Sequence, residues 1–88
     1  MTRVIWKVAM RGMTFATFLP ERAEVLSVQP QYNTPTIWLL CDPAARLVAR
    51  RFCLKATGCE FETEGHVYLG TVLLDSGDFV FHVYEVLS

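Results

Sequence analysis

His66-Val-Tyr-Leu-Gly-Thr-Val-Leu-Leu74 and Phe79-Val-Phe-His-Val-Tyr-Glu-Val86 are two runs of β-branched and aromatic residues in the last third of the chain. The cluster Asp75-Ser-Gly-Asp78, made of residues that favour turns, separates them. Two strand-forming runs joined by a short turn cluster are typical of an antiparallel β-hairpin. The sequence therefore predicts a C-terminal hairpin and a fold built mainly of β-strands.

Further strands are expected along the rest of the chain. Apolar or alternating runs predict strands over Arg3–Met10, Met13–Leu19, Val25–Gln29, Thr36–Cys41 and Leu47–Ala56. The run Thr36–Cys41 is apolar on both faces, which is typical of a central strand. The predicted fold class is all-β, or a β-rich α+β fold: a small antiparallel sandwich or barrel of about seven short strands in up-and-down order.

The sequence also predicts three local details. Leu26 and Val28 are expected on one face of their strand, because they alternate with polar residues. Pro30 and Pro35 bracket a segment that is expected to leave the ladder and form a loop, since proline cannot donate to it. Residues 43–46 are interpreted as a tight turn before the strand, and a short helix near residues 43–50 is the alternative because alanine and arginine favour helix.

The length and composition indicate one small domain, residues 1–88, whose apolar surface is large for its size. Hydrophobic residues make up 52% of the chain, and the mean hydropathy is +0.30. Small domains bury a limited core, so part of the apolar surface is expected to be covered by a second copy or another partner. We therefore expect a homo-oligomer, such as a homodimer; a tightly packed monomer with some exposed apolar side chains is the alternative.

Compartment and membrane association are predicted from what the sequence lacks. No apolar run approaches the roughly 18 residues that a membrane span needs, and the N-terminus has no basic-then-apolar signal pattern. Three cysteines at no regular spacing suit a reducing compartment better than a disulfide framework. The expected location is the cytoplasm, without membrane association.

Charge is distributed unevenly along the chain. All eight basic residues precede position 56, together with three acidic ones, whereas six acidic residues and no basic residue follow it. Such asymmetry can steer a partner. The favoured interpretation is that folding brings basic and acidic strands together, where opposite charges stabilise a sheet.

The cysteines and histidines are the residue types that could bind a metal or act as a nucleophile. Cys53, Cys59, His66 and His82 are separated by six, seven and sixteen positions, whereas structural zinc sites pair ligands about two to four residues apart. A cysteine–histidine nucleophile would need the fold to bring such residues together. No phosphate-binding glycine loop or nucleophile motif is present. The sequence thus predicts a protein that is not an enzyme, with no metal site and no cofactor.

Arg46, Arg50, Arg51 and Lys55 form a cationic segment, with Phe52 between them. A pI near 6.0 and alternation that sends Arg50 and Arg51 to opposite faces weigh against direct nucleic-acid binding. A small anionic ligand, such as a cyclic nucleotide, needs arginines, an aromatic side chain and a concave site. The candidate residues for a ligand or a partner are Arg50, Arg51, Tyr32, Trp38 and His82.

Several short runs resemble a family of small bacteriophage proteins of unknown function. They are Ile5-Trp6-Lys7, Glu24-Val-Leu-Ser-Val-Gln29, Pro35-Thr-Ile-Trp-Leu-Leu-Cys-Asp-Pro43, Arg51-Phe52, Thr57-Gly58, Tyr68-Leu-Gly-Thr71 and Phe79-Val-Phe-His-Val-Tyr-Glu85. The resemblance covers most of the chain and implies a viral origin and action in the host cytoplasm. Cys59 departs from the pattern, because many relatives have histidine after Thr-Gly, so any site that uses that histidine is in doubt here.

The leading functional hypothesis is a phage-encoded, non-enzymatic binding protein that antagonises a host defence complex such as CRISPR–Cas. A small rigid β-domain can cover a partner's surface without catalysis, using aromatic and arginine anchors. The alternative is a sponge that sequesters a cyclic-nucleotide immune signal between subunits. A small thiol- or metal-dependent hydrolase is a further alternative.

Overall fold

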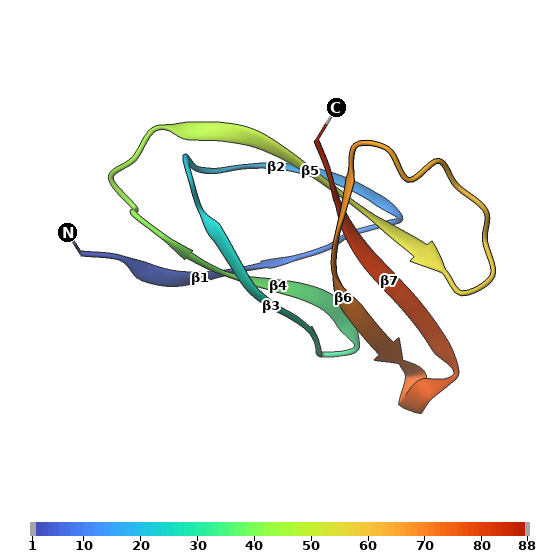
Figure 1. Cartoon of the computed structure of the whole chain (residues 1–88). Coiled ribbons are helices and arrows are strands. Elements are labelled where there is room, and N and C mark those ends of the chain that lie inside the picture. The colour runs from blue at the N-terminus through green and yellow to red at the C-terminus, as the bar shows by residue number, and fades with distance from the viewer. Residues whose placement is uncertain (1, 88) are drawn as a thin grey trace.

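Seven β-strands and one 3-10 turn make up the fold in the computed structural model, which describes residues 2–87. The strands are β1 (Val4–Ala9), β2 (Thr14–Pro20), β3 (Glu24–Gln31), β4 (Thr34–Cys41), β5 (Leu47–Ala56), β6 (His66–Leu74) and β7 (Phe79–Val86), with the 3-10 turn at Asp75–Gly77. They form a three-stranded sheet in the order β1-β4-β3 and a four-stranded sheet in the order β2-β5-β7-β6 (Figure 1). Every pairing is antiparallel, so the predicted all-β sandwich is confirmed.

The core lies between the two sheets and is built from alternate positions of the strands. β4 contributes Ile37, Leu39 and Cys41, which are 1%, 0% and 1% exposed. Phe52 of β5 and Val83 of β7 face them from the four-stranded sheet and are equally buried. Burying one such side chain contributes about 1.5–3 kcal/mol, so this layer holds the sheets together.

The up-and-down strand order predicted from the sequence is wrong. β1 pairs with β4, and β2 pairs with β5, although β1 and β2 are consecutive. The amide of Met10 still donates to the carbonyl of Pro35 in the first sheet, whereas the carbonyl of Met13 accepts from Leu54 in the second. The chain changes sheet between these residues at Gly12, whose φ of 109° favours glycine. The side chain of Met10, 2% exposed, fills the corner.

The predicted loop between Pro30 and Pro35 is also wrong, because both prolines lie within the β3–β4 hairpin and face each other. Only Tyr32 and Asn33 form the turn, with φ of 51° and 57° as a type I′ turn requires. In such a hairpin Gln31 and Thr34 form the hydrogen-bonded closing pair. The next pair, Pro30 and Pro35, is then not hydrogen-bonded to each other. The missing proline amides therefore cost the β3–β4 ladder nothing.

A bulge in β3 overturns the expected alternation of Leu26 and Val28. The register shifts between Val25 and Ser27, which places the extra residue Leu26 in solvent at 46% exposure. Val28 is buried and Val25 packs against the core. A classic bulge sets two residues opposite one, so simple alternation fails there.

Other local predictions are confirmed. β4 is the central strand of its sheet, β6 and β7 form the C-terminal hairpin, and β5 begins at Leu47. The helix considered near residues 43–50 is absent, because a carboxylate oxygen of Asp42 accepts from the amide of Ala44 and closes a turn instead. No helix among residues 2–87 is long and apolar enough to span a membrane.

Candidate functional site

The outward surface of the four-stranded sheet, here called the four-stranded face, is arranged in rows across three strands. One row joins Lys55, His82 and Thr71. The next row joins Cys53, Tyr84 and Tyr68, and a third joins Arg51, Val86 and His66. Alternation along β5 and β7 sends these side chains outward while Phe52, Leu54 and Val83 enter the core.

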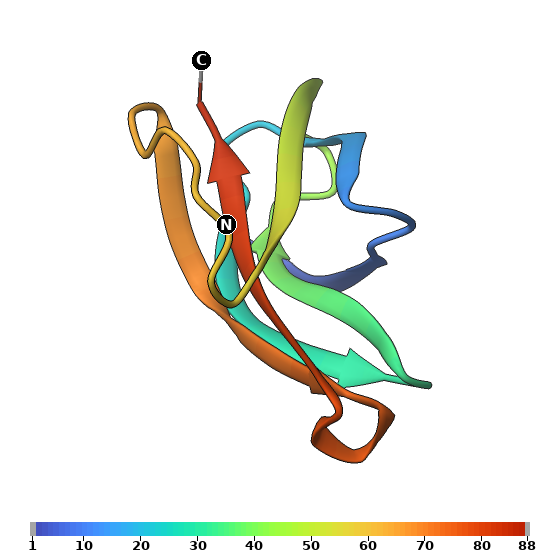
Figure 2. The same ribbon diagram turned by 90° about the vertical axis from the view of Figure 1, so that its right-hand side faces the viewer.

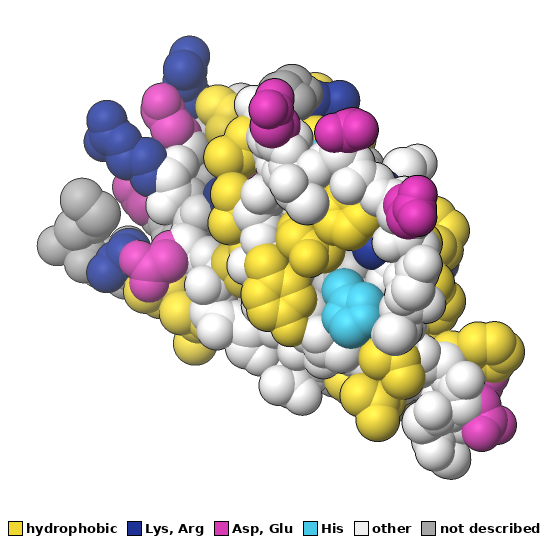
Figure 3. Space-filling view, turned by 45° about the vertical axis from the view of Figure 1, so that its right-hand side comes forward, with side chains coloured by type: hydrophobic (Ala, Val, Ile, Leu, Met, Phe, Trp, Pro, Cys, Tyr) yellow, Lys and Arg dark blue, Asp and Glu magenta, His cyan; other side chains and the backbone are white. Residues whose placement is uncertain are grey.

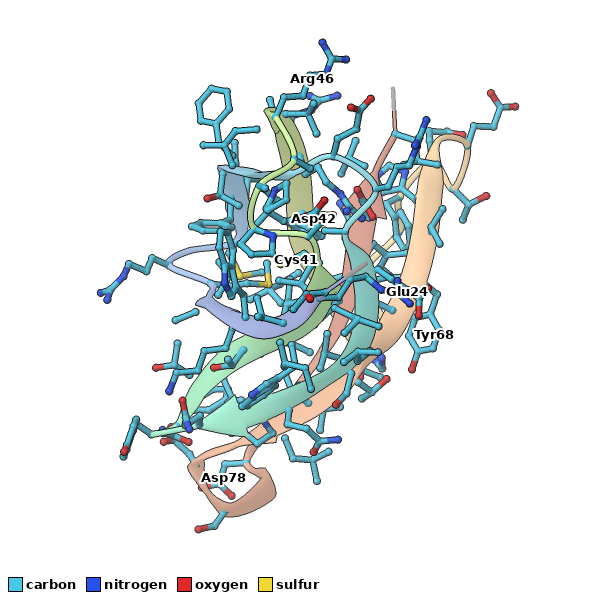
Figure 4. The ribbon with its side chains drawn as sticks, turned by 90° about the vertical axis from the view of Figure 1, so that its left-hand side faces the viewer. Glu24, Cys41, Asp42, Arg46, Tyr68 and Asp78 are labelled. Atoms are coloured by element: carbon cyan, nitrogen blue, oxygen red, sulfur yellow. The ribbon has the colours of Figure 1, made fainter. Side chains whose placement is uncertain are left out.

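A bulge in β6 is needed for this arrangement. Tyr68 and Thr71 are an odd number of residues apart, so a regular strand would send them to opposite faces. The register shifts between Tyr68 and Gly70, and the extra residue, Leu69, packs against the core. Both polar side chains therefore lie on the outside. In Figure 4 the labelled Tyr68 projects away from the sandwich, whereas Cys41 lies between the sheets.

Aromatic rings gather on the four-stranded face. Phe61, from the loop over residues 57–65, lies with its ring centroid 5.5 Å from that of His66 and 5.2 Å from that of Tyr84. Tyr68 continues the cluster at 5.5 Å from Tyr84, in edge-to-face geometry. The ammonium of Lys55 lies 4.8 Å from the centroid of Phe61, a cation–π contact. The loop is thus held onto the sheet by rings and one cation.

His82 is fixed by hydroxyl groups on both sides of its ring. Its Nε2 lies 2.8 Å from Oγ1 of Thr57, and its Nδ1 lies 2.9 Å from Oγ1 of Thr71. The hydroxyl of Tyr68 lies 2.5 Å from the same Thr71 oxygen. These contacts join β6, β7 and the start of the loop, so they set the shape of the face around the imidazole. Figure 3 shows a histidine between hydrophobic side chains, with acidic side chains along one border.

A hollow of about 450 Å³ lies on the β2–β5 part of the same face. Arg51, Lys55 and His66 supply its nitrogen-bearing side chains. Val86 and, from β2, Thr14 and Ala16 also line it; Phe15 and Phe52 border it as well, but their side chains pack in the core. Nδ1–H of His66 donates to the carbonyl of Glu64. Arg51 and Lys55 are therefore the cationic donors that line the hollow, and they suit a ligand or side chain that carries an anionic group.

The five residues selected from the sequence do not converge. Arg51 and His82 lie on the four-stranded face. Arg50 points inward to Glu85 and to the carbonyl of Ala23. The remaining two are elsewhere: Tyr32 is 92% exposed at the β3–β4 turn. Trp38 is half-buried on the outward surface of the other sheet, in register with Lys7.

Sequence reasoning selected no member of the aromatic cluster as a ligand- or partner-binding residue: Phe61, Tyr68 and Tyr84 were missed, and His66 was weighed only for metal binding and catalysis. The alternation of β7 already places Tyr84 on the face of His82, so that residue could have been found. Gly70 within the strand-forming run is a local signal for the bulge at Leu69, because an isolated glycine in a strand often marks one, whereas the folding back of Phe61 carries no local signal. That placement depends on contact with Tyr84, which lies in a later strand.

Thiol or metal chemistry finds little support in the geometry. Cys53 and His66 both line the hollow, but within residues 2–87 no hydrogen bond joins a cysteine to a histidine. Burial, aided by the neighbouring Asp42 carboxylate, raises the pKa of the Cys41 thiol, which keeps it in the unreactive protonated form. No cluster of three or more metal-ligating side chains occurs among the described residues.

The fold and this surface define a small all-β domain with a structured aromatic and cationic face. The chain belongs to the family described as "Domain of unknown function (DUF7352)", whose model matches residues 1–88. No curated protein and no solved structure matches the chain at a significant level.

Proposed function

We propose that this chain is a non-enzymatic binding protein that docks another protein on its four-stranded face. The observation that carries the proposal is the continuous surface of Arg51, Lys55, His66, Tyr68 and Tyr84 beside the hollow. Aromatic residues and arginine are the types that contribute most binding energy at protein interfaces. The rings are already held by their neighbours, which lowers the entropic cost of association.

The chemistry of the hollow favours an anionic anchor on the partner. Arg51 and Lys55 are cationic, and an aspartate, glutamate or C-terminal carboxylate would accept hydrogen bonds from them. Glu60, Glu62 and Glu64 lie in the loop that borders the face. They favour basic residues around that anchor, so the preferred partner surface has an acidic centre and a basic margin.

The identity of the partner is proposed from the sequence. The resemblance to small bacteriophage proteins supports a viral protein that acts in the host cytoplasm on a defence complex such as CRISPR–Cas. A test is to express the chain in a bacterium whose defence system targets a known phage and to count plaques. We expect the plaque number to rise on the defended host and to stay unchanged on a host without the system. Unchanged plaque numbers on hosts with each defence class would contradict this part of the proposal.

The docking face is tested by affinity capture from phage-infected cells with matched variants. Arg51→Glu and Tyr68→Ala change exposed side chains of the face, and Arg3→Glu makes the same charge change at an exposed residue just before β1. We expect a host protein that is captured by the wild type and by Arg3→Glu, and whose affinity falls by at least about tenfold in the two face variants. Equal capture by all variants would exclude this face.

A nucleotide sponge is the second candidate, and the hollow is the observation that favours it. Its volume of about 450 Å³ lies within the range of small-ligand sites. A cyclic nucleotide that binds there would raise the melting temperature of the wild type, since a ligand of the folded state stabilises it. The rise should disappear in Arg51→Glu and persist in Arg3→Glu. A panel of cyclic nucleotides that shifts no melting temperature would exclude this candidate.

A further inference from the structure

β2 is an edge strand without the protection that the other edges have. Within residues 2–87, the order of its sheet places β5 on one side of it and no strand on the other (Figure 2). The edges of β3 and β6 pack against each other, where Gly70 abuts Val28. β1 carries the exposed charge of Lys7. From Thr14 to Pro20, β2 has no charged residue at all, although charges are the usual way to block pairing at an edge.

The backbone groups that β2 leaves free can be identified from its register. Leu54 donates to the carbonyl of Met13, and Glu21 donates to the carbonyl of Arg46, so odd-numbered residues bond to β5. Antiparallel ladders alternate, and the amides and carbonyls of Thr14, Ala16 and Phe18 therefore point away from β5. The side chains of the same three residues lie on the exposed four-stranded face.

We propose that two copies of the chain pair through β2 as antiparallel neighbours, with the two-fold axis at Ala16. Pairing Ala16 with Ala16 of the partner subunit also sets Thr14 opposite the partner subunit's Phe18, so the free amides and carbonyls of all three positions are satisfied. The self-pairing meets no like charge, and the small alanine leaves room at the axis. Pro20 lacks an amide and ends the ladder.

The pairing would also complete the hollow. Thr14 and Ala16 line it on the β2 side, beyond which the sheet of residues 2–87 has no further strand. Phe18 is 67% exposed in the single chain. In the pair, Phe18 of the partner subunit lies beside Thr14 and forms the missing wall. Each docking site of the proposed function would then contain an aromatic residue from the other subunit, which is the part of this inference that rests on that function.

The dimer is tested with the purified chain alone by native mass spectrometry and sedimentation velocity at micromolar concentration. The wild type should have twice the chain mass of 10.0 kDa. Ala16→Lys places two ammonium groups opposite each other at the axis and should give monomers. Ala49→Lys adds the same charge on the same face, one strand away from the seam, and should remain dimeric.

A charge-exchange experiment tests the register. Ala16→Lys and Ala16→Glu should each be monomeric, and their equimolar mixture should form a heterodimer. Ala16→Pro removes an amide that faces solvent in the single chain, so it should fold and be monomeric. Circular dichroism and the melting temperature check that each variant is folded. A monomeric wild type, or a dimer that survives in Ala16→Lys, would overturn the inference. Because no host protein is present, that outcome is separate from a failure of the docking face.

Discussion

Arg50 and Glu85 form a bidentate ion pair on the inward side of the four-stranded sheet. Nε and Nη2 of the arginine each lie 2.7 Å from an oxygen of the carboxylate, and the side chains are only 17% and 11% exposed. The pair joins a basic residue of the first part of the chain to an acidic residue of the last. It supports the interpretation that folding resolves part of the charge asymmetry.

Removal of one partner of this ion pair should destabilise the folded protein. Arg50→Ala or Glu85→Ala leaves a mostly buried charge without its counterion, and each should lower the free energy of unfolding by about 3 kcal/mol. The double variant Arg50→Met/Glu85→Leu should lose less than either single variant, because no unpaired charge remains. Urea denaturation followed by tryptophan fluorescence measures these differences.

The control for this prediction is the exposed pair between Arg46 and Glu21, whose nitrogen and oxygen lie 3.1 Å apart with the side chains 74% and 39% exposed. Water screens such a pair, so Arg46→Ala should change stability by less than about 1 kcal/mol. An equal loss for Arg46→Ala and Arg50→Ala would show that burial does not strengthen the inner pair.

Gly70 should be intolerant of any side chain, because β6 passes close to β3 at this residue. A Cβ at Gly70 would overlap Cγ2 of the buried Val28. We expect Gly70→Ala to lower stability by about 1–3 kcal/mol through overpacking. In the double variant Gly70→Ala/Val28→Ala, the Val28 methyl groups that the new Cβ would overlap are gone. Its loss of unfolding free energy should therefore be smaller than the sum of the losses of the two single variants, as a double-mutant cycle would measure. Additive losses would show that residues 70 and 28 are not in contact.

Asn33 ties the tips of two hairpins together, and its substitutions should separate two effects. Its side-chain amide donates to Oδ1 of Asp75 at 2.5 Å, and its Oδ1 accepts from the amide of Asp75 at 2.8 Å. Asn33→Gly removes both hydrogen bonds, but glycine suits the positive φ of 57° at this position. We therefore expect the free energy of unfolding to fall by about 1 kcal/mol. Asn33→Ala removes the same hydrogen bonds, and alanine tolerates a positive φ less well than glycine or asparagine, so the free energy of unfolding should fall by about 1 kcal/mol more. Equal melting temperatures for the two variants would show that the positive φ at residue 33 adds no cost for alanine.

The strands themselves could be predicted from the sequence because each depends on local pattern. The apolar run of β4, the turn at Asp42 and the C-terminal hairpin all follow from residue types within a few positions of one another. The pairing of β1 with β4 could not be predicted this way. It depends on the change of sheet at Gly12 and on the burial of Met10, which are properties of the assembled sandwich.

The candidate site could be predicted only in part, for the same reason. Alternation correctly sent Arg50 and Arg51 to opposite faces, but it did not predict which of the two faces the core. It did not predict that Arg50 would be occupied by Glu85, a residue 35 positions away. The aromatic cluster depends on the bulge at Leu69, and a bulge shifts every later side chain to the opposite face.

The three cysteines should differ in reactivity, because only Cys59 is exposed. Cys41 and Cys53 are buried, and burial raises the pKa of Cys41, so neither offers an accessible thiolate. A thiol reagent such as DTNB at neutral pH should modify Cys59 rapidly and the other two only after denaturation. Rapid modification of all three in the native protein would contradict the burial of Cys41 and Cys53.

Cys41 should also make the folded protein less stable in alkali. The unfolded thiol loses its proton at a lower pH than the folded one, so the free energy of unfolding should fall as the pH rises above the unfolded pKa, and stop falling above the folded pKa. Below the unfolded pKa both states hold the proton and this dependence is absent. Urea denaturation at neutral and alkaline pH should show a smaller alkaline loss for Cys41→Ala than for the wild type. Cys59→Ala is the matched control and should keep the wild-type dependence; a Cys41→Ala profile parallel to that of the wild type would assign the loss to other groups.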